Sequence, residues 1–414
     1  MKAKLETWLS RGKTWLSGEP QRLPPLAPDF STRRRPFVKA SVALFIIAGY
    51  LLLVNPYWHF TPDSGVYLAL GRNLLTGRGY VFNGLPHAKY PGGMPYLLAA
   101  LMRVSTTFLW LNFASCIIVL SALGLLYLLL RDIVDLPTRL LVTLLTAVSF
   151  WTHEYASSQM SEAPFLLASN AAILCLVYYL RPQCKNRAAA LLGICAFLAL
   201  AAWFRAFSFF WAGPFAVSLL LTPGRRSAKS RLASALLIVA VLVGCLFVYR
   251  HWSHTRFLAA QEQQLLASEA QGRQLPPYRS QPNWTTVRLA TIAWPGWFTM
   301  ILAPQWRLLA KWGMPLAIIH AVDWMVLIVI ALGVWAAFRR GQVFVGAIPL
   351  FLAPFAAFGW DFTWGRYAIG VIPFVIILFL MGVKSLASVV NLSLIHISEP
   401  TRPLYISYAV FCLK

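Results

Sequence analysis

A polar loop rich in ionisable side chains follows the first strongly apolar segment of the chain. It spans residues 62–95, PDSGVYLALGRNLLTGRGYVFNGLPHAKYPGGMP, and contains one acid, three cations and a histidine: Asp63, Arg72, Arg78, Lys89 and His87. A carboxylate can accept a proton from a nucleophile, and cations can stabilise an anionic leaving group. An enzyme acting on an anionic, membrane-bound substrate needs such a set, so we interpret this loop as the candidate site.

Composition indicates the class of protein that must position this loop. Hydrophobic residues make up 59% of the chain and charged residues only 12%, against about 25% charged in an ordinary soluble domain. The apolar stretches are continuous rather than alternating, which excludes a transmembrane β-barrel. They are long enough to cross a bilayer, which takes about 20 residues each. We therefore predict an all-α polytopic membrane protein.

The apolar segments predict about ten transmembrane helices: 38–54, 106–130, 137–152, 163–180, 188–204, 206–222, 232–249, 315–338, 343–358 and 367–383. Two long outer segments remain, residues 55–105 and about 250–314. Within the first, the apolar residues between Ser64 and Leu75 recur at helical spacing, and we expect this helix to lie in the membrane interface.

The formal net charge is +23, and its distribution along the chain predicts an orientation. Basic residues recur in the even-numbered connections and after the last span: Arg131, Arg139, Arg181, Lys185, Arg187, Arg225, Arg226, Lys229, Arg231, Arg339, Arg340 and Lys384. Acids fall on the opposite side: Asp63, Glu154, Glu162, Glu262, Glu269 and Asp361. By the positive-inside rule, residues 1–37 form a cytoplasmic basic segment and the first loop is extracytoplasmic. We expect a bacterial inner membrane.

The tail of the chain does not resemble natural protein. LSLIHISEPTR, residues 392–402, and ISYAVFCLK, residues 406–414, resemble the translation of a transposase-type sequencing adapter. We interpret residues 392–414 as derived from an adapter and residues 38–391 as a transmembrane domain that is truncated at its C-terminus.

Several motifs together resemble those of the GT-C superfamily of integral-membrane glycosyltransferases. The most specific lie in the first loop: Asp63 after the first span, GVYLALGRNLL, TGRGYVFNG and LPHAKYPGGMPYLLA. SSQMSEAPF, WFRAFSFFW and WGRYAIGVIPF fit less specifically. The pattern is most similar to bacterial aminoarabinose transferases and protein O-mannosyltransferases. This resemblance implies a GT-C-like bundle with interfacial helices in its first outer loop. The implied activity is inverting transfer of a sugar from a polyprenyl-phosphate carrier to an extracytoplasmic acceptor.

Asp63 is the predicted general base, since it is the only acid of the first loop, and the resemblance assigns it the same role. Its alternative is to cap the helix that we expect to begin near Ser64. Lys89, in AKYP, resembles the lysine of a Lys-Pro-Pro element that meets the lipid phosphate in aminoarabinose transferases. Its alternative is to extend towards lipid headgroups.

Arg205 and Arg366 are further predicted contacts of the donor phosphate, because both lie at the outer ends of spans, where an unpaired charge is costly. A structural ion pair is the alternative, for example between Arg366 and Asp361. Glu162 is expected to orient the acceptor, or to stabilise the start of a helix through the helix dipole. His87 could contact phosphate or a metal, or be a solvated loop histidine. Arg72 and Arg78 are interpreted as headgroup contacts.

Two positions depart from the family patterns. Ser64 stands where protein O-mannosyltransferases usually have glutamate, and Ala88 stands where aminoarabinose transferases have an acid. The sequence therefore does not support a divalent metal or another cofactor. It also contains no P-loop or nucleotide-binding fingerprint, which favours a lipid-linked donor over a nucleotide sugar.

Two other classes of function remain open at this point. A transporter or flippase of lipid-linked sugars would carry its ionisable residues at mid-membrane depth. A non-catalytic membrane protein of envelope assembly would tolerate the loss of Asp63. The expected partners are the lipid-linked donor, a glycan, lipid or protein acceptor, and membrane lipids, but not nucleic acid. Neither the sugar nor the acceptor follows from the sequence.

Overall fold

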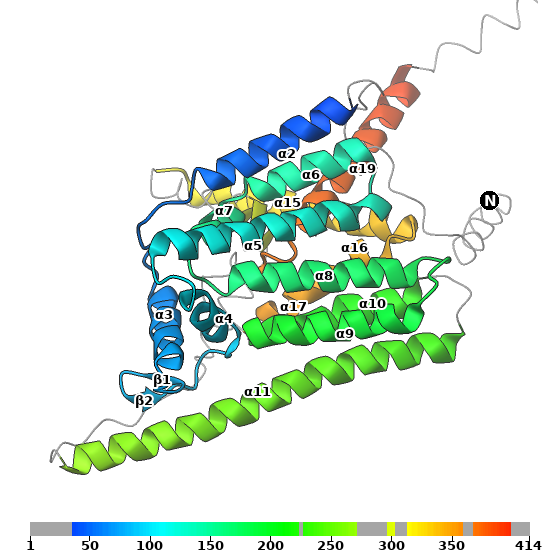
Figure 1. Ribbon diagram of the computed structural model, residues 1–414. Helices are drawn as coiled ribbons and strands as arrows, with labels where there is room; N and C mark the ends of the chain where they lie inside the picture. Colours follow the sequence, from blue (N-terminus) through cyan, green and yellow to red (C-terminus); the bar gives the residue numbers. More distant parts are fainter. Residues whose placement is uncertain (1–34, 223–226, 271–295, 303–312, 359–366, 399–414) are drawn as a thin grey trace, which may run out of the picture.

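The structure, a computed structural model, describes residues 35–222, 227–270, 296–302, 313–358 and 367–398. Apart from one short hairpin, the described elements are helices (Figure 1). The first half contains α2 (Arg35–Leu51), α3 (Pro62–Leu75), β1 (Val81–Phe82), β2 (Leu85–Pro86), α4 (Gly93–Met102), α5 (Phe108–Leu129), η1 (Leu130–Asp132), α6 (Leu136–Ala147), α7 (Phe150–Ala156) and α8 (Glu162–Leu180). The second half contains α9 (Arg187–Phe204), η2 (Ala206–Trp211), α10 (Ala212–Leu221), α11 (Ala228–Ala270), α13 (Gly296–Leu302), α15 (Leu316–Arg339), α16 (Val343–Ala347), α17 (Pro349–Phe358) and α19 (Ile372–Ser398).

The predicted class, an all-α polytopic membrane protein, is confirmed. Each predicted span finds a helix in the structure. Among the described residues, five helices are long and apolar enough to cross a membrane: Phe108–Asp132, Glu162–Leu180, Arg187–Phe204, Ala228–Gln263 and Leu316–Arg339. The count of about ten spans and the domain boundaries stay predictions.

Three predicted spans are each divided between two helical elements: 137–152 between α6 and α7, 206–222 between η2 and α10, and 343–358 between α16 and α17. The expected span 137–152 consists of α6 and α7, because α6 ends at Ala147 and Ser149 caps a new helix by accepting a hydrogen bond from the backbone N–H of Thr152 at 3.4 Å. A serine at this position offers the backbone an N-cap in place of continued helix.

The helix that contains the seventh predicted span, residues 232–249, is longer than that span. It is α11, which runs from Ala228 to Ala270. No proline or glycine interrupts residues 250–270, which are rich in Ala, Leu, Gln and Glu, and these are good helix formers. A helix of 43 residues is about 65 Å long, about twice the thickness of the hydrocarbon core. In Figure 1 its C-terminal half runs past the end of the bundle where α3, α4 and the hairpin lie.

The bundle is held by buried aromatic packing and close helix contacts. The fully buried ring of Trp211 packs against Phe351, with centroids 4.5 Å apart, and its indole N–H donates to Ser169 at 3.2 Å. Helices α15 and α19 approach most closely at Gly333 and Gly382, where an added Cβ would clash with the facing backbone. Small residues permit such approach between membrane helices.

Charged residues lie at both ends of the helix bundle. Arg181, at the end of α8, pairs with Asp132 after α5, and the loop that follows α15 lines the same hollow. The first-loop elements α3 and α4 and the start of α8 lie at the opposite end of the bundle (Figure 1). The orientation of these two ends across the membrane stays a prediction.

Candidate active site

The first loop is shaped by turns that its glycines and one asparagine permit. Asn83 and Gly84 join β1 to β2 and have φ angles of 52° and 82°. Positive φ at both residues is the signature of a tight type I′ hairpin. After the hairpin, α4 packs against the end of α9, where a Cβ added to Gly93 would lie 2.6 Å from the carbonyl oxygen of Trp203. Glycine at this position lets α4 approach α9.

Asp63 lies in the first turn of α3, but it is not the helix cap. Helix α3 begins at Pro62 rather than near Ser64, and its N-cap is Thr61, whose hydroxyl accepts a hydrogen bond from the backbone N–H of Ser64 at 3.0 Å. The hydroxyl of Ser64 in turn accepts from the N–H of Thr61, which completes a capping box. The alternative role that we considered for Asp63 is therefore wrong, and its carboxylate is available for other contacts.

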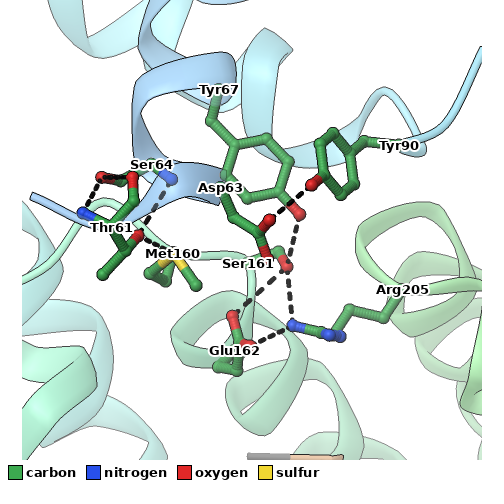
Figure 2. A network of polar contacts seen from close by, with 9 residues as sticks. All are labelled: Thr61, Asp63, Ser64, Tyr67, Tyr90, Met160, Ser161, Glu162 and Arg205. Atoms are coloured by element: carbon green, nitrogen blue, oxygen red, sulfur yellow. Dashed lines mark hydrogen bonds and ion pairs between the residues drawn. The ribbon is translucent and has the colours of Figure 1, made fainter. Parts of the chain in front are cut away.

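The carboxylate of Asp63 accepts a hydrogen bond from the hydroxyl of Tyr90 (Figure 2). Tyr90 belongs to the segment between β2 and α4, so this bond joins the two ends of the first loop. The ring of Tyr90 packs between that of Tyr67, with centroids 4.9 Å apart, and that of His87, with centroids 5.2 Å apart. The side-chain ammonium of Lys89 lies 4.7 Å from the same ring.

Glu162 and Arg205 form an ion pair inside the bundle. The side chain of Glu162 is fully buried and that of Arg205 is 7% exposed. The guanidinium of Arg205 also donates to the hydroxyl of Ser161 at 3.1 Å and lies over the rings of Phe207 and Tyr367. The structure thus shows the pairing that we considered as the alternative to phosphate contact, and a role of Arg205 towards phosphate stays a prediction.

Two tyrosines connect this ion pair to Asp63. The hydroxyls of Tyr67 and Ser161 share a hydrogen bond of 3.1 Å, and burial raises the pKa of the Tyr67 phenol. The ring of Tyr67 packs on that of Tyr90, so this contact places the hydrogen-bonded group around Arg205 beside the bond between Tyr90 and Asp63 (Figure 2). These residues come from α3, the first loop, the start of α8 and the end of α9.

Lys89 and His87 line a groove of about 970 Å³ between the first loop and the C-terminal half of α11. Its other lining residues include the cation Arg250 and the histidines His251 and His254, all on α11. No acid is among the residues that line it, within the part of the chain that the structure describes. The groove is therefore suited to an anionic ligand. Neither Asp63 nor the ion pair of Glu162 with Arg205 lines it.

Helix α11 holds the first loop in place through three hydrogen bonds to backbone carbonyls. Tyr249 donates to Lys89 at 2.6 Å, Ser253 donates to Ala88 at 2.7 Å, and Arg256 donates to Tyr80 at 3.1 Å. The sequence interpretation missed these contacts because their partners are far apart in the chain and because its predicted span ended at residue 249, before Ser253 and Arg256. An uninterrupted run of helix-forming residues through Ala270 was the signal that could have revealed them.

His87 is neutral at physiological pH. Burial, followed by the nearby charges of Lys89 and Arg256, lowers its pKa to about 4. Its Nε2 faces the backbone N–H of Tyr90 at 3.3 Å, in a geometry that suits an unprotonated acceptor nitrogen. The structure therefore favours His87 as a support of the loop over a cationic contact of phosphate. Within the described residues, no group of three or more His, Cys, Asp or Glu side chains is placed to hold a metal ion.

Arg366, the last of the predicted site residues, and Asp361, its possible ion-pair partner, lie outside the described residues. Tyr90, Tyr67 and Ser161 were missed by the sequence interpretation. Their types are common in helix and loop positions, and only their spatial grouping distinguishes them. Tyr90 alone had a local signal, because it follows Lys89 directly in the AKYP motif.

Comparisons with known proteins find a matching family model and similar solved structures. The family model described as dolichyl-phosphate-mannose-protein mannosyltransferase matches residues 89–249. The crystal structure of apo ArnT from Cupriavidus metallidurans is similar at 14% identity with a TM-score of 0.51 and covers 86% of this chain. The oligosaccharyltransferase AglB from Archaeoglobus fulgidus, in complex with an inhibitory peptide and a dolichol-phosphate, has 14% identity and a TM-score of 0.48, covering 92% of this chain and 54% of that one.

A search of curated proteins finds no match to the chain. The chain spans 60% of the length of ArnT. Its fold is similar to that of ArnT. The chain resembles the GT-C superfamily, and within it the group of protein mannosyltransferases and ArnT, as the motifs of the first loop predicted.

Proposed function

We propose that this protein transfers a sugar from a polyprenyl-phosphate carrier to an acceptor on the extracytoplasmic face of a membrane. The observation that carries the proposal is the arrangement around Tyr90. Its hydroxyl contacts the carboxylate of Asp63, and Lys89 lies over its ring at the edge of a groove whose described lining residues include no acid. A proton acceptor and a phosphate-binding cation thus stand on the same rigid loop. The matched family description also names a lipid-phosphate sugar as donor.

Each residue then has a role set by its chemistry. Asp63 accepts the proton of the acceptor hydroxyl as the new glycosidic bond forms. Lys89 binds the donor phosphate and stabilises the charge that it gains as the sugar leaves. The side chains of Arg250, His251 and His254 extend the polar wall of the groove. Direct attack on the sugar carbon that bears the phosphate inverts its configuration.

Glu162 and Arg205 support the site from inside the bundle. Arg205, paired with Glu162, donates to Ser161, which shares a hydrogen bond with Tyr67, and the ring of Tyr67 packs on that of Tyr90. Arg366 is a further proposed contact of the donor phosphate. We infer a bacterial inner membrane as the location, with the N-terminus cytoplasmic, on the charge distribution of the helix ends.

The deciding experiment uses the purified protein in lipid nanodiscs. It would receive undecaprenyl-phosphate and dolichyl-phosphate carriers of mannose, glucose and aminoarabinose, together with peptide, glycan and lipid acceptors. Donor consumption and product would be followed by mass spectrometry. We expect one donor to be consumed by the wild type and transfer to fall by about 100-fold or more in Asp63→Asn, with donor binding retained. Full activity of Asp63→Asn would contradict the assignment of the base.

The donor-binding role of Lys89 is tested separately by the dissociation constant of the same donor. Lys89→Ala should weaken binding, whereas Arg72→Ala, which removes an exposed cation of α3 outside the groove, should not. Equal donor binding without turnover in the wild type and Asp63→Asn would instead favour a transporter or a non-catalytic envelope protein.

A further inference from the structure

Tyr90 contacts three of the residues that the sequence predicted for the site. Its hydroxyl donates to Asp63, the ammonium of Lys89 lies over its ring, and its backbone N–H faces the imidazole of His87. Rings on both sides restrict its orientation, with interplanar angles of 53° to Tyr67 and 26° to His87. The hydroxyl is therefore aimed at Asp63 by surroundings that leave the ring little freedom.

The direction of the hydrogen bond has a chemical consequence. An ionised carboxylate only accepts hydrogen bonds, and a phenol donates one readily. A donor that bonds to the charged form favours that form over the protonated acid. The hydrogen bond from Tyr90 therefore favours the state in which the proton is on Tyr90 and the charge is on Asp63.

We propose that Tyr90 is a positioning residue that keeps the carboxylate of Asp63 ionised and oriented, and that couples it to the cation Lys89 across its ring. The catalytic consequence rests on the proposed function, but the effect on Asp63 itself does not. Lys89 contributes because a cation within about 6 Å of an aromatic centroid is attracted to the ring face. Movement of Lys89 towards a donor phosphate would therefore weaken its interaction with the ring of Tyr90. That change would in turn alter the hydrogen bond from the Tyr90 hydroxyl to Asp63.

Tyr90→Phe is the discriminating variant because it keeps the ring contacts and removes only the hydroxyl. Tyr57→Phe is the matched control: it removes a hydroxyl from the same outer region, where the Tyr57 side chain is 74% exposed. The protonation of Asp63 would be followed by infrared spectroscopy of the protein in nanodiscs between pH 3 and pH 9. The carboxyl band of Asp63 is identified by its loss in Asp63→Asn.

We expect the Asp63 band to emerge at a pH about one unit higher in Tyr90→Phe than in the wild type, since a hydrogen bond to a charged group is worth about that much. Tyr57→Phe should titrate like the wild type. An unchanged midpoint in Tyr90→Phe would overturn the inference, whether or not the protein transfers sugar.

The kinetic readout separates this inference from the proposed function. Where the wild type transfers sugar, the acid limb of its kcat profile should move to higher pH in Tyr90→Phe by the same amount as the infrared midpoint. Activity that falls equally at every pH, with no shift of the acid limb, would reduce Tyr90 to a structural role. A wild type without transfer would contradict the proposed function alone, because the infrared titration still decides the role of Tyr90.

Discussion

Glu162 and Arg205 lie 43 positions apart in the sequence and form an ion pair in the interior of the bundle. Glu162 opens α8 and Arg205 directly follows α9, so the pair ties the two helices together at the end where the first loop lies. The helix dipole of α8 adds to the stabilisation of Glu162, whose carboxylate is in its first turn. The pair also fixes Ser161 and, through it, Tyr67.

Breaking this pair should destabilise the protein strongly. Glu162→Gln or Arg205→Gln leaves the other charge buried without its counter-ion, at a cost of about 3–5 kcal/mol. The double variant Glu162→Gln with Arg205→Gln leaves no such charge and should cost less than the sum of the two single changes. The measurement is the free energy of unfolding in detergent micelles for all four proteins.

The pair of Arg181 with Asp132 is the control, because its side chains are 42% and 27% exposed. Asp132→Asn should change the free energy of unfolding by about 1 kcal/mol or less. If Glu162→Gln and Arg205→Gln lower the free energy of unfolding by no more than Asp132→Asn does, burial does not determine how much the pair of Glu162 with Arg205 contributes to stability.

The hydrogen bonds from α11 to the first loop should slow the hydrogen exchange of the backbone amides of that loop. The double variant Tyr249→Phe with Ser253→Ala removes two hydrogen bonds to the loop backbone, each worth about 1 kcal/mol. We expect the amides of residues 80–90 to exchange at least about tenfold faster, because the loop opens more often. His87, whose amide bonds to the carbonyl of Tyr80 at 3.1 Å, is the informative position.

Thr255→Ala is the matched control for this loosening. Its hydroxyl bonds to the carbonyl of Trp252 within the same helix, at 3.0 Å, so its removal should leave exchange in the first loop unchanged. Equal exchange rates in the double variant and in the wild type would mean that these hydrogen bonds from α11 do not restrict the opening of the loop.

His87 should make stability fall on acidification. Its pKa is about 4 in the folded protein and 6.5 in the reference state that represents the unfolded chain. Between these values the unfolded chain binds more protons than the folded one, so lowering the pH favours unfolding. The contribution is complete above about pH 6.5 and is lost as the pH falls towards 4.

Comparison of His87→Gln with the wild type tests this at pH 7 and pH 5. The loss in unfolding temperature between the two pH values should be smaller in His87→Gln, which has no imidazole to protonate. His59→Gln, at an exposed histidine, should keep the loss seen in the wild type. An identical loss in all three proteins would exclude His87 as its source.

The sequence by itself determined the class of the protein and the location of its candidate site. Long apolar runs predict membrane helices because the bilayer requires every backbone polar group to be satisfied within the segment. The ionisable side chains of residues 62–95 identify the candidate loop because such groups are costly at a membrane unless they serve a function. Both signals are local, so one sequence is sufficient to detect them.

Only the tertiary structure decided which side chains meet. The bond from Tyr90 to Asp63, the pair of Glu162 with Arg205 and the contact of α11 with the first loop all join segments that are far apart in the chain. Helices that are apolar on every side have no polar face to show which neighbour each will take. Their arrangement follows from packing at positions such as Gly93 and Gly333. That packing brings the polar residues at the helix ends together.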